Sequence, residues 1–259
     1  VHGKTGGRNA PTVWNSAFHG VQFWDGRAPL LEDQAKGPVA NPIEMGMKDV
    51  DTAMDRVRAI PGYKPYFDAA FGEDSMTVDN AAKAVAAFER TLITPNSAYD
   101  KYVKGDKKAM TAQQVKGMET FQSVGCTSCH SGAAFNGPQK LGTGFYAKFP
   151  TFADNAFEKK YNFSADKGRE EVTAKAADKN MFRVATLRNI TDTAPYFHNG
   201  AVNDLSEAVR VMAKTQLNRD LSDKEVADIV DFLGALTGPY PEITMPRLPA
   251  TSGHSLVAD

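Results

Sequence analysis

Apolar residues recur at helical spacing in five stretches of this chain. Within residues 77–93, apolar side chains return every three or four positions, as at Ala81, Ala84 and Phe88. The same spacing predicts further helices over residues 49–60, 111–124, 204–215 and 222–237. Strand-like alternation of apolar and polar residues is weak throughout. We therefore expect a mainly α fold.

Between these helices the pattern predicts loops. Residues 1–48 are rich in Gly, Pro and Asn and show little periodicity, yet they contain aromatic residues such as Trp14 and Trp24 that favour burial. We expect this stretch to be ordered loop laid over an apolar surface. Residues 93–106 read as a connector, and residues 131–180 as polar and irregular.

Charge and hydropathy exclude two classes of partner. The 259 residues carry a formal net charge of −1, so no basic excess favours nucleic acid. No apolar run reaches about 18 residues, so no membrane span is predicted. No charged stretch followed by an apolar one opens the chain. We therefore expect that a signal peptide has been removed or that the sequence starts within a longer protein.

Both cysteines lie in one pentapeptide, Cys126-Thr127-Ser128-Cys129-His130. This is the pattern of covalent c-type haem attachment, in which two thiols join the porphyrin and the histidine binds the iron. A redox dithiol would follow a βαβ pattern, and a zinc ribbon needs a second cysteine pair. The sequence therefore predicts one haem c and a redox role outside the cytoplasm.

Spacing alone leaves the second axial ligand of this iron open. Methionine ligation suits an electron-transfer haem, and Met212 lies on a predicted helix downstream of the motif. Met181, Met245 and His198 are the alternatives. A methionine on a helix is also common as core filler.

Several longer strings, taken together, indicate a family. They are HGKTGGRNAPTVWN, QFWDGRA, LLEDQAKGPVANPIEM, GCTSCHSG and FRVATLRNITDTAPYFHNGAV. With them the chain resembles the bacterial dihaem cytochrome c peroxidases over nearly its whole length. The resemblance implies two cytochrome c-like domains with long ordered loops. Residues 1–95 would be the remainder of an incomplete N-terminal domain, 96–238 the C-terminal domain and 239–259 a surface tail.

The resemblance also assigns roles at the two haems. His130 and Met212 match the ligands of the C-terminal, high-potential haem, and Trp24 matches an aromatic residue between the haems. His2 matches the loop histidine that caps the peroxidatic iron in the resting enzyme. Glu44 then matches the distal acid/base.

Further positions follow from the same match. Gln34 matches the neighbour of that acid/base and could orient peroxide by hydrogen bonding. A calcium site would take the side-chain oxygen of Asn9 and the carbonyls of Thr193 and Pro195, an all-oxygen set that suits this ion.

The implied function is a periplasmic peroxidase that reduces hydrogen peroxide to water. Its electrons would come from a small cytochrome c or a blue-copper protein, and a homodimer is expected. The family carries two haems c per full-length chain, whereas this sequence holds one attachment motif. We expect truncation upstream of His2, the alternative being a relative that lost the first haem.

Two other functions account for part of this sequence. A non-enzymatic electron-transfer cytochrome accounts for the haem motif and Met212, but leaves Gln34 and Glu44 unexplained. A cofactor-maturing oxidase of the methylamine-utilisation type would carry tyrosine in place of Met212, so this function ranks last.

Overall fold

The contacts in this computed structural model, which describes residues 3–250, divide the chain into two compact units. Unit 1 contains the described residues up to Gly6, Leu31–Thr91 and those from Glu242 onward; unit 2 contains Gly7–Leu30 and Leu92–Pro241. The predicted division into 1–95 and 96–238 stays a prediction. The contacts differ from it by grouping Gly7–Leu30 with the later part of the chain.

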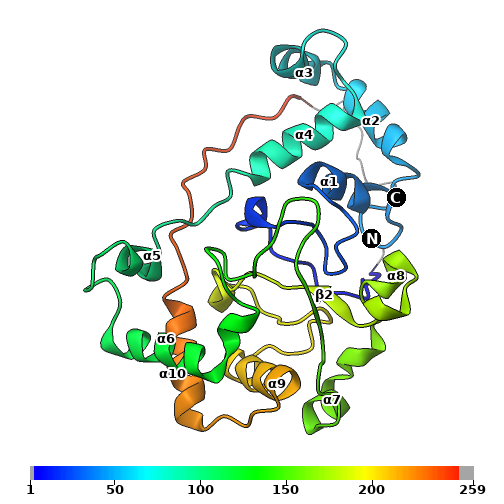
Figure 1. Cartoon of the computed structure of the whole chain (residues 1–259). Helices are drawn as coiled ribbons and strands as arrows, with labels where there is room; N and C mark the ends of the chain where they lie inside the picture. Colours follow the sequence, from blue (N-terminus) through cyan, green and yellow to red (C-terminus); the bar gives the residue numbers. More distant parts are fainter. Residues whose placement is uncertain (1–2, 251–259) are drawn as a thin grey trace. The chain divides into compact units, whose positions relative to one another are not determined.

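Unit 1 is helical. Its helices are α1 (Leu31–Ala40), α2 (Val50–Arg58), α3 (Lys64–Phe71) and α4 (Val78–Glu89), with a 3-10 turn at Pro61–Tyr63 (Figure 1). Helix α1 packs against α4, and two ion pairs join them: Lys36 to Asp79 at 2.6 Å and Arg90 to Glu32 at 2.8 Å.

The prediction of loop throughout residues 1–48 is wrong at α1. Gly37 and Pro38 read as a turn signal in the sequence, but both lie inside the helix. Proline removes one helical hydrogen bond and crowds the preceding turn. Pro38 lies in the last turn of α1, which ends at Ala40, so the disturbance is confined to the end of the helix.

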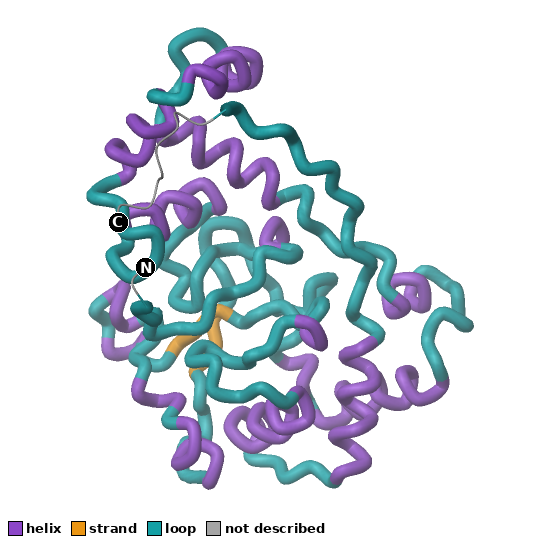
Figure 2. The backbone as a smooth tube through the Cα atoms, turned by 180° about the vertical axis from the view of Figure 1, so that it is seen from behind, coloured by secondary structure: helices purple, strands orange, loops and turns teal. Residues whose placement is uncertain are grey.

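Unit 2 is built from short elements joined by long loops (Figure 2). Its helices are α5 (Ala98–Val103), α6 (Ala112–Val124), α7 (Ala156–Tyr161), α8 (Glu170–Thr173), α9 (Leu205–Leu217) and α10 (Asp223–Gly234). Its 3-10 turns are Ser16–Phe18, Cys126–Ser128, Phe163–Ala165, Ala176–Asp178 and Ile190–Asp192. Strands β1 (Tyr146–Lys148) and β2 (Met181–Arg183) pair antiparallel, with Ala147 opposite Phe182. The predicted connector over residues 93–106 contains α5.

Helices α6 and α10 form the centre of one core. Capping boxes start both helices, at Thr111 and Gln114 in α6 and at Ser222 and Glu225 in α10. Gly117 lets the helices approach closely, since a Cβ there would overlap the backbone carbonyl of Asp228. Around this contact pack buried aromatic and aliphatic residues, among them Phe121, Phe135, Val226, Ile229 and Phe232.

All five predicted helices are present, and the mainly α class is confirmed. Their ends differ from prediction by up to four residues, as is usual where the last turn frays. In the C-terminal tail, residues 239–250 have no regular secondary structure.

Candidate haem-binding site

The haem motif begins where α6 ends. Gly125 follows the helix with φ 104°, a left-handed conformation that glycine adopts without steric cost. The chain then enters the 3-10 turn at Cys126–Ser128, and the amide of His130 donates to the carbonyl of Cys126 at 2.9 Å. Both cysteines are free, half-buried thiols. The turn thereby places two thiols and one imidazole together.

The environment of Cys126 bears on the redox-dithiol and zinc interpretations of this motif. Burial raises the pKa of Cys126 to about 11, so the thiol stays protonated near neutral pH. A redox-active cysteine has a lowered pKa, so this environment does not favour a redox dithiol. Among residues 3–250, no group of three or more His, Cys, Asp and Glu side chains could hold a metal ion, which does not favour a zinc site.

His130 is buried and held in one orientation. Its Nδ1 lies 3.0 Å from the carbonyl oxygen of Phe135, which can only accept, so Nδ1 carries the proton. Burial lowers the pKa of His130, which keeps the ring neutral. The lone pair is then on Nε2, the arrangement found in histidines that bind metals.

The motif opens onto a cavity of about 240 Å³ that lies entirely within unit 2. Cys126, Cys129, His130 and Met212 all line it. Helix α9 forms one wall through residues spaced three or four apart: Leu205, Ala208, Val209, Met212, Ala213 and Gln216. Other apolar walls come from Phe121, Phe182, Val184, Leu187, Ile190, Tyr196 and Leu233. An apolar cavity with two thiols, an imidazole and a thioether fits a covalently attached porphyrin.

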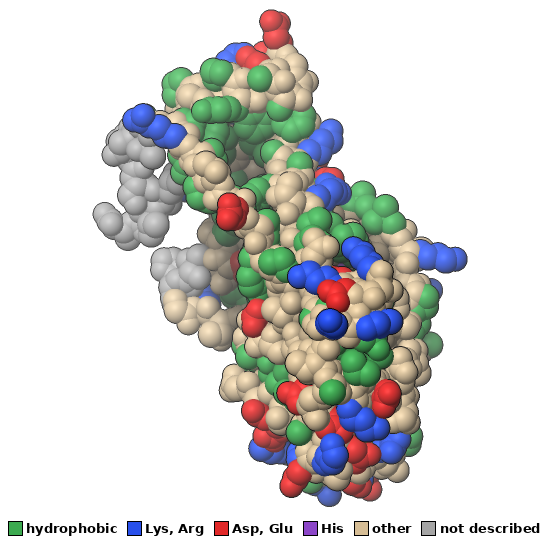
Figure 3. All heavy atoms as spheres, turned by 90° about the vertical axis from the view of Figure 1, so that its left-hand side faces the viewer, with side chains coloured by type: hydrophobic (Ala, Val, Ile, Leu, Met, Phe, Trp, Pro, Cys, Tyr) green, Lys and Arg blue, Asp and Glu red, His purple; other side chains and the backbone are tan. Residues whose placement is uncertain are grey.

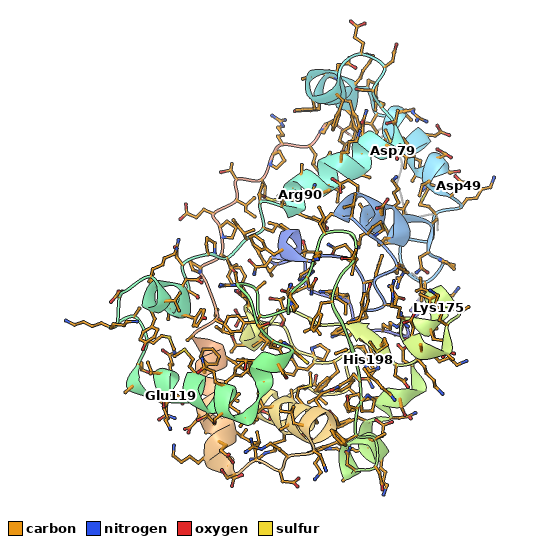
Figure 4. All side chains as sticks on the ribbon, in the orientation of Figure 1. Asp49, Asp79, Arg90, Glu119, Lys175 and His198 are labelled. Carbon is orange, nitrogen blue, oxygen red and sulfur yellow. The ribbon has the colours of Figure 1, made fainter. Side chains whose placement is uncertain are left out.

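Among the candidates for the second axial ligand, the structure favours Met212. Met181 does not line the cavity, and Met245 is 77% exposed in unit 1. His198 does line it, but its Nε2 lies 3.1 Å from the carbonyl of Phe163. Its ring also stacks on Phe182 at 4.2 Å, so this imidazole is held by the protein itself. Figure 4 shows His198 in the interior of unit 2, unlike Glu119 and Lys175 at its periphery.

Trp24 and the predicted calcium ligands lie along the same cavity. The indole Nε1 of Trp24 donates to the carbonyl of Asn9 at 2.9 Å. The side-chain nitrogen of Asn9 donates to the carbonyl of Pro195 at 2.7 Å, and Thr193 also lines the cavity. The structure thus brings Asn9 and Pro195 together, with the amide nitrogen rather than the oxygen facing the carbonyl.

Two polar residues of the cavity wall escaped the sequence analysis. His19 and Arg183 are both buried, and both line the cavity. The only signal for Arg183 was a cation between apolar neighbours, Phe182 and Val184. His19 lay in a stretch read as loop, where no pattern marks a buried position.

The comparisons with known proteins identify the family of this chain. The family model for di-haem cytochrome c peroxidase matches residues 1–108. A cytochrome c551 peroxidase of Nitrosomonas europaea is 42% identical over 247 residues, covering 95% of this chain and 70% of that protein. The cytochrome c551 peroxidase of Pseudomonas aeruginosa is also 42% identical, over 97% of this chain and 71% of that protein. The chain belongs to the di-haem cytochrome c peroxidase family.

A solved structure supports the fold of this peroxidase. A MauG-like protein associated with microbial copper homeostasis superposes with a TM-score of 0.73 at 27% identity. The match covers 92% of this chain and 77% of that protein. The identities to named peroxidases support an enzyme of this kind, so the alternative of a non-enzymatic carrier is not favoured.

The predicted peroxidatic residues of this peroxidase, Gln34 and Glu44, fall in unit 1. Gln34 is half-buried on α1, and Glu44 is exposed in the turn that follows. The side-chain nitrogen of Asn41 donates to Glu44 at 2.7 Å. His2 lies outside the described residues. Their roles stay predictions.

One face of the peroxidase shows how its charged side chains are distributed (Figure 3). Acidic and basic side chains lie next to one another on the face in Figure 3, without a large area of one sign. Among residues 3–250, no helix is long and apolar enough to cross a bilayer.

Proposed function

We propose that the protein is a periplasmic peroxidase that reduces hydrogen peroxide to water, taking electrons from a small cytochrome c or a blue-copper protein. One observation carries this proposal: in a chain of the peroxidase family, Cys126, Cys129, His130 and Met212 converge on a single apolar cavity. The balance of the reaction is hydrogen peroxide plus two electrons and two protons giving two waters.

In the proposal, unit 2 is the site of electron uptake. A haem c bound there would supply reversible one-electron exchange. His130 would hold its iron through Nε2, because the Phe135 carbonyl fixes the proton on Nδ1. Met212 would supply a soft thioether, a ligand that raises the reduction potential. Trp24 would serve electron transfer, and its hydrogen bond to Asn9 holds the indole beside this cavity.

Unit 1 supplies the residues that handle peroxide. Glu44 would take the proton from one peroxide oxygen and return it to the leaving oxygen, as a general base and then a general acid. Gln34 would orient peroxide by hydrogen bonding. The solvent exposure of Glu44 gives it a route for exchanging protons with water. His2 would cap the second iron in the resting state and leave on reduction. Gly3, Gly6 and Gly7 would allow this movement, because glycine gives the neighbouring backbone a wide choice of conformations.

The remaining parts of the proposal concern calcium and assembly. Calcium would bind the Asn9 oxygen and the carbonyls of Thr193 and Pro195, which requires the Asn9 amide to turn over. The closeness of Asn9 to the Pro195 carbonyl supports this site. A second haem c per full-length chain and a homodimer are proposed from the family resemblance.

Two measurements made together test this function: the number of haems per polypeptide and the rate of peroxide consumption. Haem per polypeptide would be measured by pyridine haemochrome absorbance on protein from its native source, and peroxide consumption with a reduced small cytochrome c as donor. Two haems and peroxide-dependent oxidation of the donor are expected. One haem that exchanges electrons with the donor, but no consumption of peroxide, would make the protein an electron carrier and overturn the proposal.

A further inference from the structure

Arg183 is a buried cation without an acidic partner among the described residues. The residue is 2% exposed, and its Nη1 has no hydrogen-bond partner within the described part of the chain. Burial lowers the pKa of Arg183 to about 10, which still leaves the guanidinium charged at neutral pH. A buried charge without a counter-ion is strongly unfavourable. Arg183 is therefore placed where an anion is needed.

Two other largely buried arginines of unit 2 are paired with acids. Arg188 forms a two-pronged contact with Asp100, at 2.7 and 3.0 Å. Arg8 contacts Asp166 at 2.7 Å and also pairs with Asp25. Arg183 is more deeply buried than either, yet no acid of the described residues pairs with it.

His19 adds a second unpartnered group. It is 4% exposed, and no described residue hydrogen-bonds its Nε2. Burial, and then the nearby charge of Arg183, lower the pKa of His19 well below its usual range, so the ring is neutral. A neutral imidazole donates one hydrogen bond through the nitrogen that carries the proton. Both side chains line the cavity that holds the haem motif.

We propose that Arg183 and His19 form an anion site for a propionate carboxylate of the haem attached at Cys126 and Cys129. This inference rests on the proposed haem site of unit 2. Haem carries its two carboxylates on propionate side chains, so the ligand that fills the apolar cavity also supplies the missing counter-ion. Arg183 is well suited to bind a carboxylate, because its planar guanidinium can donate two parallel hydrogen bonds to the two oxygens.

Arg183 would also connect this carboxylate to the segment that bears Trp24. Its Nε donates to the carbonyl of Phe23 at 3.2 Å, and its backbone amide donates to the carbonyl of Trp24 at 2.8 Å. Phe23 has φ 64°, a conformation that a bulky residue seldom adopts without such restraint. Arg183 is thus a positioning residue that ties the Trp24 segment to the propionate.

The test uses the full-length holoprotein, with Arg183→Gln and Arg183→Lys as the two variants. Arg210→Gln is the matched control, since it removes the same charge from a residue of unit 2 that does not line the cavity. Haem content and the absorption spectrum of the methionine-ligated haem are recorded first. We would then measure the propionate bending mode in the resonance Raman spectrum and the midpoint potential of this haem.

Arg183→Gln should shift the propionate mode and lower the midpoint potential, because an unneutralised carboxylate favours ferric iron. We expect a change of about tenfold in the redox equilibrium, which corresponds to 59 mV for one electron. Arg183→Lys should show less than half of this shift, and Arg210→Gln should show no shift of the propionate mode.

The outcomes separate this inference from the haem assignment. If wild-type protein carries no haem at Cys126 and Cys129, the proposed function itself fails. If haem is bound but the propionate mode is the same in wild type and both Arg183 variants, the anion site is refuted while the haem site stands. If inorganic phosphate shifts the potential of the wild type but not of Arg183→Gln, a free anion occupies the site and the propionate assignment is wrong.

Discussion

The ring of His130 donates its Nδ1 proton to the carbonyl oxygen of Phe135 at 3.0 Å. Phe135 lies only five residues further along the chain, in a loop where its φ is 52°. The loop therefore folds back over the imidazole and fixes its tautomer. An electron-transfer ligand benefits from this restraint, because the ring does not have to reorient when the iron changes charge.

Met212→Ala should remove the second axial ligand while leaving the haem attached at Cys126 and Cys129. We expect the midpoint potential of this haem to fall by tenths of a volt, within the roughly 0.8 V that axial ligands control. Redox titration and haem content would be measured together. Met181→Leu is the control, since Met181 does not line the cavity. An unchanged potential in Met212→Ala would exclude Met212 as ligand.

Glu44→Gln should lower the turnover of peroxide by roughly 10²–10⁴-fold, the usual contribution of a general acid–base residue. Haem content and the potential of the Met212 haem should not change. Glu73→Gln is the matched control, because Glu73 is also an exposed carboxylate of unit 1. Equal activity of the two variants would remove Glu44 from the mechanism.

Asp100→Asn should destabilise unit 2 by about 3 kcal/mol, because it leaves the Arg188 charge without its acid. The pair is largely buried, with side-chain exposures of 14% for Asp100 and 10% for Arg188. Denaturant unfolding followed by circular dichroism measures the loss. Glu119→Gln breaks an exposed pair with Lys116 and should cost no more than about 1 kcal/mol. A similar loss in both variants would contradict the buried-pair interpretation.

The same pair predicts a pH dependence of stability. Burial alone would raise the pKa of Asp100, but its hydrogen bonds and ion pair with Arg188 outweigh burial and lower it. A carboxyl whose folded pKa is lowered stabilises the fold above its unfolded value, about 3.9. That stability is lost as the pH falls through the folded value. The gap in unfolding free energy between wild type and Asp100→Asn should be constant from pH 7 to 5 and narrow below about pH 4.

Gly117→Ala should separate α6 from α10, because the added Cβ would overlap the carbonyl of Asp228. Overpacking of this kind costs about 1–3 kcal/mol. Gly234→Ala on α10 is the control: its Cβ would meet nothing within 4 Å, so it should be neutral or stabilise by up to roughly 1 kcal/mol. Thermal unfolding of both variants gives the comparison. Equal stability would show that the helices can move apart freely.

The sequence was most informative where local rules decide the structure. Capping residues such as Thr111 and Ser222 and the pentapeptide at Cys126–His130 carry their own signals, so helix starts and the haem motif were predictable. Helix α1 was missed because Gly37 and Pro38 contradict a helix locally, whereas packing against α4 stabilises it. Arg183 was missed because its importance arises from burial and from the absence of an acid nearby, which only tertiary structure defines.

The contacts of Arg8 bear on the order in which unit 2 can fold. Arg8 pairs with Asp25 inside its own segment, Gly7–Leu30, and with Asp166 and Glu171, which are made much later. A chain emerging from the ribosome must therefore synthesise Leu31–Thr91 of unit 1 before this segment finds these partners. Until then Trp14 also lacks Tyr240, against which its ring packs in the folded protein. Such long-range closure slows folding, so assembly of the haem site depends on the last-made half of the chain returning to the first.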